Sequence, residues 1–275
     1  MAPATRTARK KRKTMAERAD RHQLYEDAVQ CVEAEIDFVD TTFLELRGRK
    51  ARWVREDFCG TGNTSCEWVR RRNTNHAIGV DLDTDVQQWG RDHHIAGLPT
   101  AAQKRIALVE ANVMSVDCRV VDVVLAMNFS YWIFKERKLL RRYFRHVHQG
   151  LKDDGVLMLD AYGGPDAHKE LRERKKQARY TYVWHQKFYD PINANLICQI
   201  HFTFPDGSRI KEAFTYDWRV WSLPEIRDIL LEAGFKQVTV YWEGNDEDGD
   251  GDGVFTPAKV GEADQAFIVY VVAEK

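Results

Sequence analysis

Two glycines and one carboxylate form the part of the sequence best suited to chemistry. Gly60 and Gly62 follow the strand-like stretch 52–57, and Asp81 comes nineteen residues after Gly62, at the end of the apolar stretch 77–81. Glycine lets a backbone turn tightly and approach a ligand without a Cβ in the way. In a nucleotide-binding βαβ unit this spacing places an acid on the two ribose hydroxyls. We therefore expect a ribose-containing cofactor at this turn.

The residues around the turn distinguish two classes of cofactor. A dinucleotide site favours Gly-x-Gly-x-x-Gly, because the pyrophosphate lies among bare amides at a helix N-terminus. Here Ser65 stands where the third glycine of that pattern belongs. Glu56 and Asp57 directly precede the turn, where they would repel a pyrophosphate but attract a cofactor that carries an ammonium and a sulfonium. A nicotinamide-dependent oxidoreductase is disfavoured for these reasons.

With these features the stretch resembles the first motif of class I S-adenosylmethionine-dependent methyltransferases, acid-x-Gly-x-Gly-x-Gly. Glu56 matches the acid, Gly60 and Gly62 match the last two glycines, and Phe58 replaces the first. The resemblance implies S-adenosyl-L-methionine as cofactor and S-adenosyl-L-homocysteine as product. It covers roughly residues 50–163 motif by motif and the remainder more loosely.

The resemblance also implies further cofactor contacts. Asn112 falls where the family keeps a polar group for the adenine amine, and the loop 128–130 follows a near-continuous apolar run typical of a strand buried on both faces. Arg55 is a candidate for the cofactor's carboxylate, with an exposed cation at a strand end as the alternative. Tyr25 and Gln30 lie in an amphipathic segment expected to cover the pocket, although Tyr25 equally suits the edge of a core. The implied cofactor residues are Tyr25, Arg55, Glu56, Phe58, Cys59, Gly60, Thr61, Gly62, Asp81, Leu82, Asn112, Val113, Met114, Asn128, Phe129 and Ser130.

The expected architecture is an α/β, Rossmann-like class I methyltransferase fold with a seven-stranded, mostly parallel sheet and an antiparallel lid insertion. We expect a charged helix over 167–179 and three lid strands over 180–189, 195–204 and 209–218, which alternate or carry β-branched and aromatic residues. The predicted units are a disordered basic tail (1–20), a helical cap (21–50), the cofactor-binding core (51–163), the helix and lid (164–221) and the C-terminal completion of the sheet (222–275).

Methyl transfer is an in-line displacement that needs alignment and desolvation more than a covalent nucleophile. An amine or phenol acceptor must still lose a proton, for which residues of the lid strands are candidates, each with a purely structural role as the alternative: His201, His185, Tyr216 and Asp217. An excess of aromatic residues suits a planar or cationic acceptor. The candidate acceptor contacts are Tyr131, Trp132, Tyr162, Trp184 and Trp218, any of which would otherwise belong to the core.

Composition limits the remaining possibilities. The net charge is −1, 44% of residues are hydrophobic, and no apolar run is long enough to span a membrane. The basic start lacks the apolar region of a signal peptide, so we expect a cytoplasmic protein. The five cysteines are an odd number and include no Cys-x-x-Cys pair, so we expect free thiols in a reducing compartment. The acidic segment 243–253 matches half of a calcium loop, but Pro257 replaces the bidentate glutamate, so we expect no metal.

The sequence therefore predicts transfer of a methyl group to a nitrogen or oxygen of a small metabolite, aromatic or amine. A first alternative is a protein or RNA methyltransferase whose substrate is recruited by the basic block 9–13. If the block has no such role, it is part of a solvated, disordered tail. We do not expect nucleic-acid binding, because the rest of the chain offsets this charge. A second alternative is a non-catalytic, cofactor-binding regulatory protein. A homo-oligomer is left open.

Overall fold

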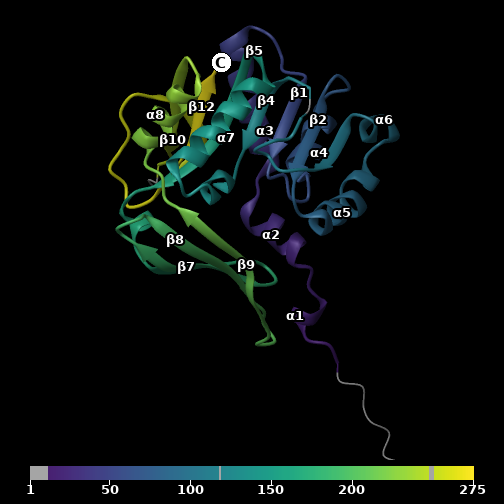
Figure 1. Cartoon of the computed structure of the whole chain (residues 1–275). Coiled ribbons are helices and arrows are strands. Elements are labelled where there is room, and N and C mark those ends of the chain that lie inside the picture. Colours follow the sequence, from purple (N-terminus) through teal and green to yellow (C-terminus); the bar gives the residue numbers. More distant parts are fainter. Residues whose placement is uncertain (1–11, 118, 248–250) are drawn as a thin grey trace, which may run out of the picture.

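Two β-sheets, one above the other in Figure 1, organise the protein. The computed structural model describes residues 12–117, 119–247 and 251–275. In this part of the chain the larger, core sheet has eight strands in the order β11-β10-β12-β5-β4-β1-β2-β3. Its strands are β1 (Trp53–Asp57), β2 (His76–Asp81), β3 (Ile106–Glu110), β4 (Val121–Ala126), β5 (Leu151–Gly163), β10 (Gln237–Asn245), β11 (Gly251–Ala258) and β12 (Phe267–Glu274).

The first five strands of the core sheet pair in parallel, and β12 lies antiparallel between β5 and β10. All six residues of β4 are buried, as expected of a central strand covered on both faces. The α/β Rossmann-like architecture is therefore confirmed. The sheet has eight strands instead of seven, because β10 continues to Asn245 and β11 forms an added edge from part of the predicted acidic loop. Asp248 and Asp250 of the half calcium loop lie outside the described residues.

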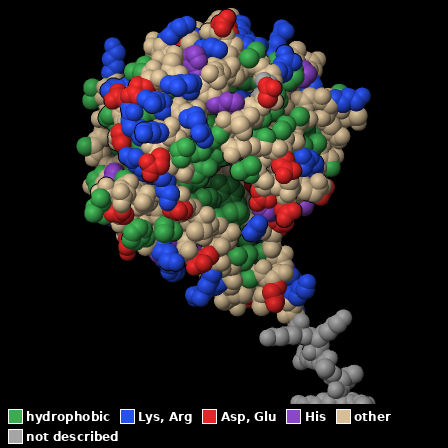
Figure 2. Space-filling model, viewed as in Figure 1, with side chains coloured by type: hydrophobic (Ala, Val, Ile, Leu, Met, Phe, Trp, Pro, Cys, Tyr) green, Lys and Arg blue, Asp and Glu red, His purple; other side chains and the backbone are tan. Residues whose placement is uncertain are grey.

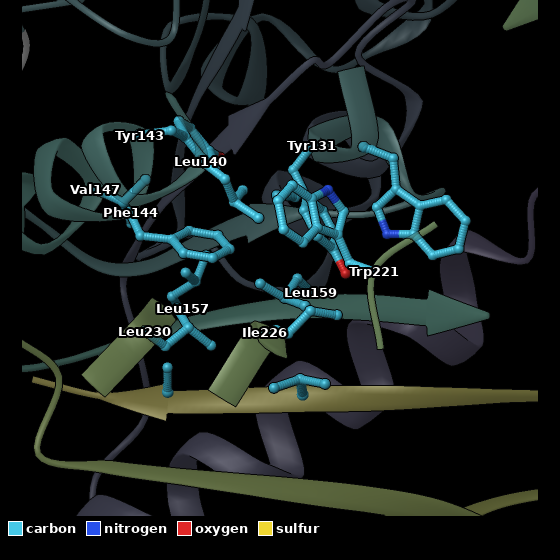
Figure 3. Packing of buried hydrophobic residues seen from close by; sticks show 14 of the residues in the cluster. Tyr131, Leu140, Tyr143, Phe144, Val147, Leu157, Leu159, Trp221, Ile226 and Leu230 are labelled. Atoms are coloured by element: carbon cyan, nitrogen blue, oxygen red, sulfur yellow. The ribbon is translucent and has the colours of Figure 1, made fainter. Parts of the chain in front are cut away.

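Helices cover both faces of the core sheet. On one face, side chains of α7 (Arg137–Gly150) and α8 (Leu223–Ala233) pack on β5, as Figure 3 shows for Phe144, Leu157 and Leu230. On the other face, α3 (Val32–Arg47) and α4 (Asn63–Arg71) pack through a second buried cluster. The core also contains the helix α5 (Thr84–His93) and the short helical segments η1 (Ile95–Gly97), α6 (Thr100–Gln103) and η2 (Ser130–Ile133).

The smaller sheet is the lid, with strands in the order β6-β7-β8-β9. They are β6 (Leu171–Lys176), β7 (Thr181–Asp190), β8 (Asn195–Thr203) and β9 (Arg209–Arg219), all antiparallel. The charged helix predicted over 167–179 is wrong: a short turn, η3 (Pro165–His168), leads into β6, which pairs with β7. Its charged side chains suit an edge strand, because they remain in water and discourage pairing with another chain.

The N-terminal segment bridges the two sheets. The predicted disordered tail 1–20 is wrong for its second half, where α1 (Met15–Arg18) donates the Met15 amide to Asp206 (2.7 Å) and the Ala16 amide to Ser208 (3.0 Å), both in the lid. Residues 1–11, including part of the basic block 9–13, lie outside the described residues. Next, α2 (Arg21–Val29) runs between lid and core (Figure 1).

Two remaining expectations concern membranes and thiols. No helix in the described ranges is long and apolar enough to cross a membrane. Cys31, Cys59, Cys66 and Cys198 are free thiols, and Cys118 lies outside the described residues.

The packing of α5 on the glycine turn generates a testable prediction. A Cβ added at Gly90 would lie 1.9 Å from the carbonyl oxygen of Thr61, so the turn and the helix could not both keep their places. We expect Gly90→Ala to destabilise the fold by about 1–3 kcal/mol, although alanine favours helix more than glycine does. Gly97→Ala is the control, because nothing lies within 4 Å of its added Cβ. Equal melting temperatures for the two variants would contradict this packing.

Candidate active site

The glycine turn joins β1 to α4 and carries the backbone conformation that the motif demands. Gly60 (φ 53°) and Gly62 (φ 71°) are left-handed, and so is Phe58 (φ 60°), which occupies the position of the motif's first glycine. A phenylalanine is strained there, so the turn keeps the motif's shape without its usual residue. A Cβ at Gly60 would meet nothing within 4 Å, which leaves open space beside the backbone for a ligand.

Asp81, at the end of β2, is bonded to this turn. Its Oδ2 accepts a hydrogen bond from the Gly60 amide (2.8 Å), and its Oδ1 accepts one from the Asp83 amide (2.9 Å). These two bonds fix the carboxylate at the carboxyl edge of the sheet while leaving further lone pairs of both oxygens available. The predicted pairing of the glycine turn with Asp81 is thus present in the structure.

A cavity of about 490 Å³ opens between this edge and the lid, and we call it the acidic cavity. Its acidic side chains are Glu56, Asp57, Asp81 and Asp83, against Arg21 as the one lysine or arginine among the described residues of its wall. Figure 2 shows a hollow lined by hydrophobic side chains in this region, with acidic side chains beside it. The predicted cofactor residues that line it are Tyr25, Glu56, Phe58, Cys59, Gly60, Thr61, Asp81, Asn128 and Ser130, together with Gln30.

Buried carboxyls surround the start of α4. Glu56 accepts hydrogen bonds from the amide (2.9 Å) and hydroxyl (2.5 Å) of Ser65, and burial raises its pKa to about 8. Burial likewise raises the pKa of Glu35 to about 7, and its charge contributes to the raised pKa of Glu56. A cation placed beside Glu56 would favour its ionised form, so the cavity is suited to a positively charged group.

The helix α2 closes this cavity through bonds to the core. The Asp20 carboxylate caps α2 and accepts a hydrogen bond from the Trp89 indole (2.7 Å) of α5. Glu26 accepts one from the Thr61 hydroxyl (2.6 Å) in the glycine turn. On the lid side, the Tyr25 ring lies 4.9 Å from that of Phe214. The expectation that the N-terminal helices cover the pocket therefore agrees with the geometry.

A second cavity, of about 470 Å³, adjoins the first, and we call it the aromatic cavity. In the described part of the chain its wall contains two carboxylates, Glu173 and Glu243, and no lysine, arginine or histidine. Its rings are Tyr25, Phe129, Tyr162, Tyr182, Trp184, Tyr216, Trp218 and Phe267, with Tyr216 and Trp218 stacked at 4.4 Å. Four residues line both cavities and mark their junction: Tyr25, Asn128, Tyr216 and Trp218.

Asp160, at the carboxyl half of β5, shapes this junction. Its two oxygens accept hydrogen bonds from the amides of Asn128 and Phe129 (both 2.8 Å), which are held at left-handed φ values of 57° and 55°. Burial raises the pKa of Asp160 to about 7. The carboxyl acts on the loop that carries Asn128 and is absent from the described residues that line either cavity.

Several predicted cofactor residues lie elsewhere. Arg55 is buried and paired with Asp57 (2.8 Å), which also accepts a hydrogen bond from Tyr143 of α7, so neither alternative for Arg55 holds. Side chains alternate along β1, so Arg55 faces α7 while Glu56 faces the start of α4. Outside the lining of both cavities are also Gly62, Leu82, Asn112, Val113 and Met114.

Most of the catalytic candidates are misplaced for catalysis at the junction. His185 and His201 lie on the outer face of the lid, and Asp217 pairs with Lys135 (2.6 Å). Tyr216 is the candidate that lines the cavities, where its hydroxyl and that of Tyr25 are hydrogen-bonded. Burial raises the pKa of Tyr25 to about 12 and the pKa of Tyr216 well above its usual value, so both hydroxyls are neutral donors.

The acceptor candidates divide in the same way. Tyr162, Trp184 and Trp218 line the aromatic cavity, whereas Tyr131 and Trp132 are fully buried in the core. Sequence reasoning missed Glu173 and Glu243, the two carboxylates of this wall. Glu173 lies between Arg172 and Arg174 in the segment expected to be a helix. In a helix, alternation of charge from one residue to the next does not assign side chains to opposite faces. On a strand, that alternation puts it on the inner face.

Comparison with known proteins gives the fold. No protein-family model and no curated protein matches the chain. Among solved structures, an S-adenosylmethionine-dependent methyltransferase from Clostridium acetobutylicum superposes with a TM-score of 0.69 at 16% identity, over 92% of this chain and 96% of that one.

Two further structures are an amino pentose methyltransferase from Micromonospora echinaspora (TM-score 0.65, 14% identity, 97% and 99% covered) and a sugar N-methyltransferase from Streptoalloteichus (TM-score 0.62, 17% identity, 100% and 98% covered). The chain has the fold of class I methyltransferases, as the sequence motifs predict.

The buried carboxyls predict how stability depends on pH. The folded chain holds the Glu35 proton with a pKa of about 7, against the usual 4.5, so unfolding releases a proton between these values and stability falls as pH rises through them. Glu35→Gln removes the ionisation, and the variant should gain on the order of 1–3 kcal/mol relative to the parent on going from pH 5 to pH 8. Urea denaturation at both pH values measures this change.

The control is Glu33→Gln, which alters an exposed glutamate of the same helix. It should keep the parent's dependence on pH. If Glu35→Gln kept it too, the Glu35 carboxyl would not be a buried acid.

Proposed function

We propose that the protein transfers a methyl group from S-adenosylmethionine to a nitrogen of a small, positively charged amine. The observation that carries this proposal is the junction of two cavities of different chemistry. The acidic cavity lies against the glycine turn and against Asp81, the carboxylate expected to bind the ribose hydroxyls. The other is aromatic, contains two carboxylates and has no cationic side chain among the described residues of its wall.

The residues of the acidic cavity fit this cofactor. We assign Glu56 to the ammonium and Asp81 to the ribose hydroxyls, because both line this cavity, and the open space beside Gly60 supports a close approach of the ligand to the backbone. A pyrophosphate in the same place would meet the Asp81 carboxylate, and it would gain nothing from Glu56, whose raised pKa favours a cation as its neighbour, so a dinucleotide is disfavoured. When bound, the cofactor supplies a methyl group on a sulfonium, a carbon open to attack by a lone pair.

The aromatic cavity supports an amine as acceptor. A protonated amine would be attracted by Glu173 and Glu243 and by the faces of Trp184 and Trp218. Before attack, the amine must lose its proton. The neutral Tyr25 and Tyr216 hydroxyls are not bases at pH 7, so the proton passes to solvent water before the free amine reaches the junction. We infer that these two hydroxyls orient the acceptor at the junction, and that alignment and exclusion of water provide most of the rate. Two structures of the same fold are named as an amino pentose methyltransferase and a sugar N-methyltransferase, which supports a nitrogen acceptor here.

Calorimetric titration with S-adenosylmethionine, S-adenosylhomocysteine and NADH tests the cofactor. We expect binding of the first two ligands and not of the third. Asp81→Ala should weaken both by about 2–3 kcal/mol, because charge-assisted bonds to the ribose are lost. Asp85→Ala, an exposed change in the first turn of α5, should bind like the parent. Unchanged affinity in a folded Asp81→Ala protein would remove the assignment of Asp81.

The charge of the acceptor is tested separately. The double substitution Glu173→Gln, Glu243→Gln should raise KM for a protonated amine acceptor about threefold to tenfold and leave kcat and cofactor affinity nearly unchanged. The amide side chain introduced at position 243 keeps an oxygen for the bond that Glu243 accepts from the Gly253 amide. Glu170→Gln is the matched control, since that exposed residue lies outside the aromatic cavity. An unchanged KM for the protonated amine in the double variant would argue for a different substrate class.

A further inference from the structure

The outer face of the lid sheet carries a third cavity, of about 310 Å³, that the proposed reaction does not use. Side chains alternate along the lid strands, so Glu173, Trp184 and Tyr216 face the aromatic cavity while their neighbours face outward. The two faces of this single layer differ in chemistry. Among the described residues, the inner wall has carboxylates and no cation, whereas the outer wall has four cations, Arg172, Arg174, Arg209 and Lys211, against one carboxylate, Glu212.

The four cations lie on the two outer strands of the lid and have no ion-pair partner among the described residues. Elsewhere in the protein, arginines commonly pair with carboxylates, as Arg47 does with Glu274 and Arg72 with Asp40. Arg172 and Arg174 come from β6, and Arg209 and Lys211 come from β9, so they flank the cavity from opposite sides. Unpaired cations gathered around a hollow create a positive potential there.

Two histidines, His185 and His201, lie between the cations of β6 and those of β9, which form the two rims of the cavity. Hydrogen bonds determine which ring nitrogen of each histidine carries the proton. The Glu212 amide donates to Nδ1 of His201 (2.9 Å), so the proton of a neutral His201 is on Nε2. That Nε2 lies 3.4 Å from Nδ1 of His185, which also lies 3.0 Å from the Arg172 guanidinium and therefore accepts. A neutral His185 consequently carries its proton on Nε2. Burial and the charge of Arg172 lower the pKa of both histidines, which keeps them neutral.

We infer that this outer cavity is a binding site for a small molecule that carries two or more adjacent phosphate charges. Guanidinium groups match phosphate oxygens with paired hydrogen bonds, and the two rims place such groups on both sides of the ligand. One carboxylate or halide would neutralise only a fraction of the four cations. The cations surround a hollow and do not extend as a flat stripe, which favours a compact anion over a nucleic acid strand.

The test is calorimetric titration of the full chain with inorganic pyrophosphate at low ionic strength. We expect one site per chain, and the double substitution Arg172→Gln, Arg209→Gln should weaken it by at least about tenfold. The matched control, Arg142→Gln with Arg145→Gln, removes the same charge from exposed positions of α7 and should bind like the parent. Melting temperature and affinity for S-adenosylmethionine, unchanged in both variants, show that the fold is intact.

A second readout locates the ligand. Pyrophosphate should shift the ring nitrogen NMR signals of His185 and His201 and leave those of His22 and His94 in place. Absence of binding, or equal weakening by the two double variants, would overturn the proposal. Binding of a single-stranded RNA oligonucleotide far tighter than pyrophosphate, with the same dependence on Arg172 and Arg209, would overturn it in favour of a nucleic-acid surface.

Discussion

Three carboxyl groups near the carboxyl ends of β1, β2 and β5, those of Glu56, Asp81 and Asp160, form the constraint on which the rest of the structure depends. Glu56 and Asp160 are buried, and Asp81 is partly exposed. Each of these groups is satisfied by backbone amides: Glu56 by Ser65, Asp81 by Gly60 and Asp83, and Asp160 by Asn128 and Phe129. These bonds hold the loops that form the cavities. They only partly offset the cost of burial, so the pKa values of Glu56 and Asp160 stay raised. A cationic ligand in the acidic cavity would offset part of this cost at Glu56, which lines that cavity.

The lid is a single sheet that separates two electrostatic environments. Its inner face completes the aromatic cavity, and its outer face carries four cations that have no ion-pair partner in the described part of the chain. Side chains alternate along each lid strand. A shift of one residue in the pairing of a strand would therefore move its inner side chains to the outer face and its outer side chains to the inner face. The lid is also held from the side: α1 donates two amides to the β8–β9 turn, and the Tyr180 hydroxyl lies 3.4 Å from the Leu24 carbonyl of α2. The N-terminal segment therefore couples the lid to the glycine turn through Glu26 and Thr61.

Phe58 shows how the turn tolerates a departure from the motif. Its left-handed backbone reproduces the conformation of the missing glycine, and its ring packs 6.0 Å from Phe134 and 5.8 Å from Tyr143. Contacts of this kind offset part of the strain of a non-glycine residue at positive φ. The same ring forms part of the acidic cavity's wall, so the substitution narrows the space that a glycine would leave open.

The sequence by itself determined the features that depend on neighbouring residues: the glycine turn, Asp81 at its fixed spacing, the buried run of β4, and with them the fold of the core. Tertiary structure alone decided which face a side chain occupies. Arg55 and Glu56 are adjacent, yet of these two only Glu56 lines the cavity. The pleat of β1 sends them to opposite sides, and on its own side Arg55 is buried in an ion pair with Asp57. In the charged segment 167–179 no local feature of the sequence distinguishes a solvated helix from an edge strand. Its central part, β6, is a strand because it pairs with β7. That pairing turned Glu173 inward and Arg172 outward, since the pleat has a period of two residues whereas the expected helix has 3.6.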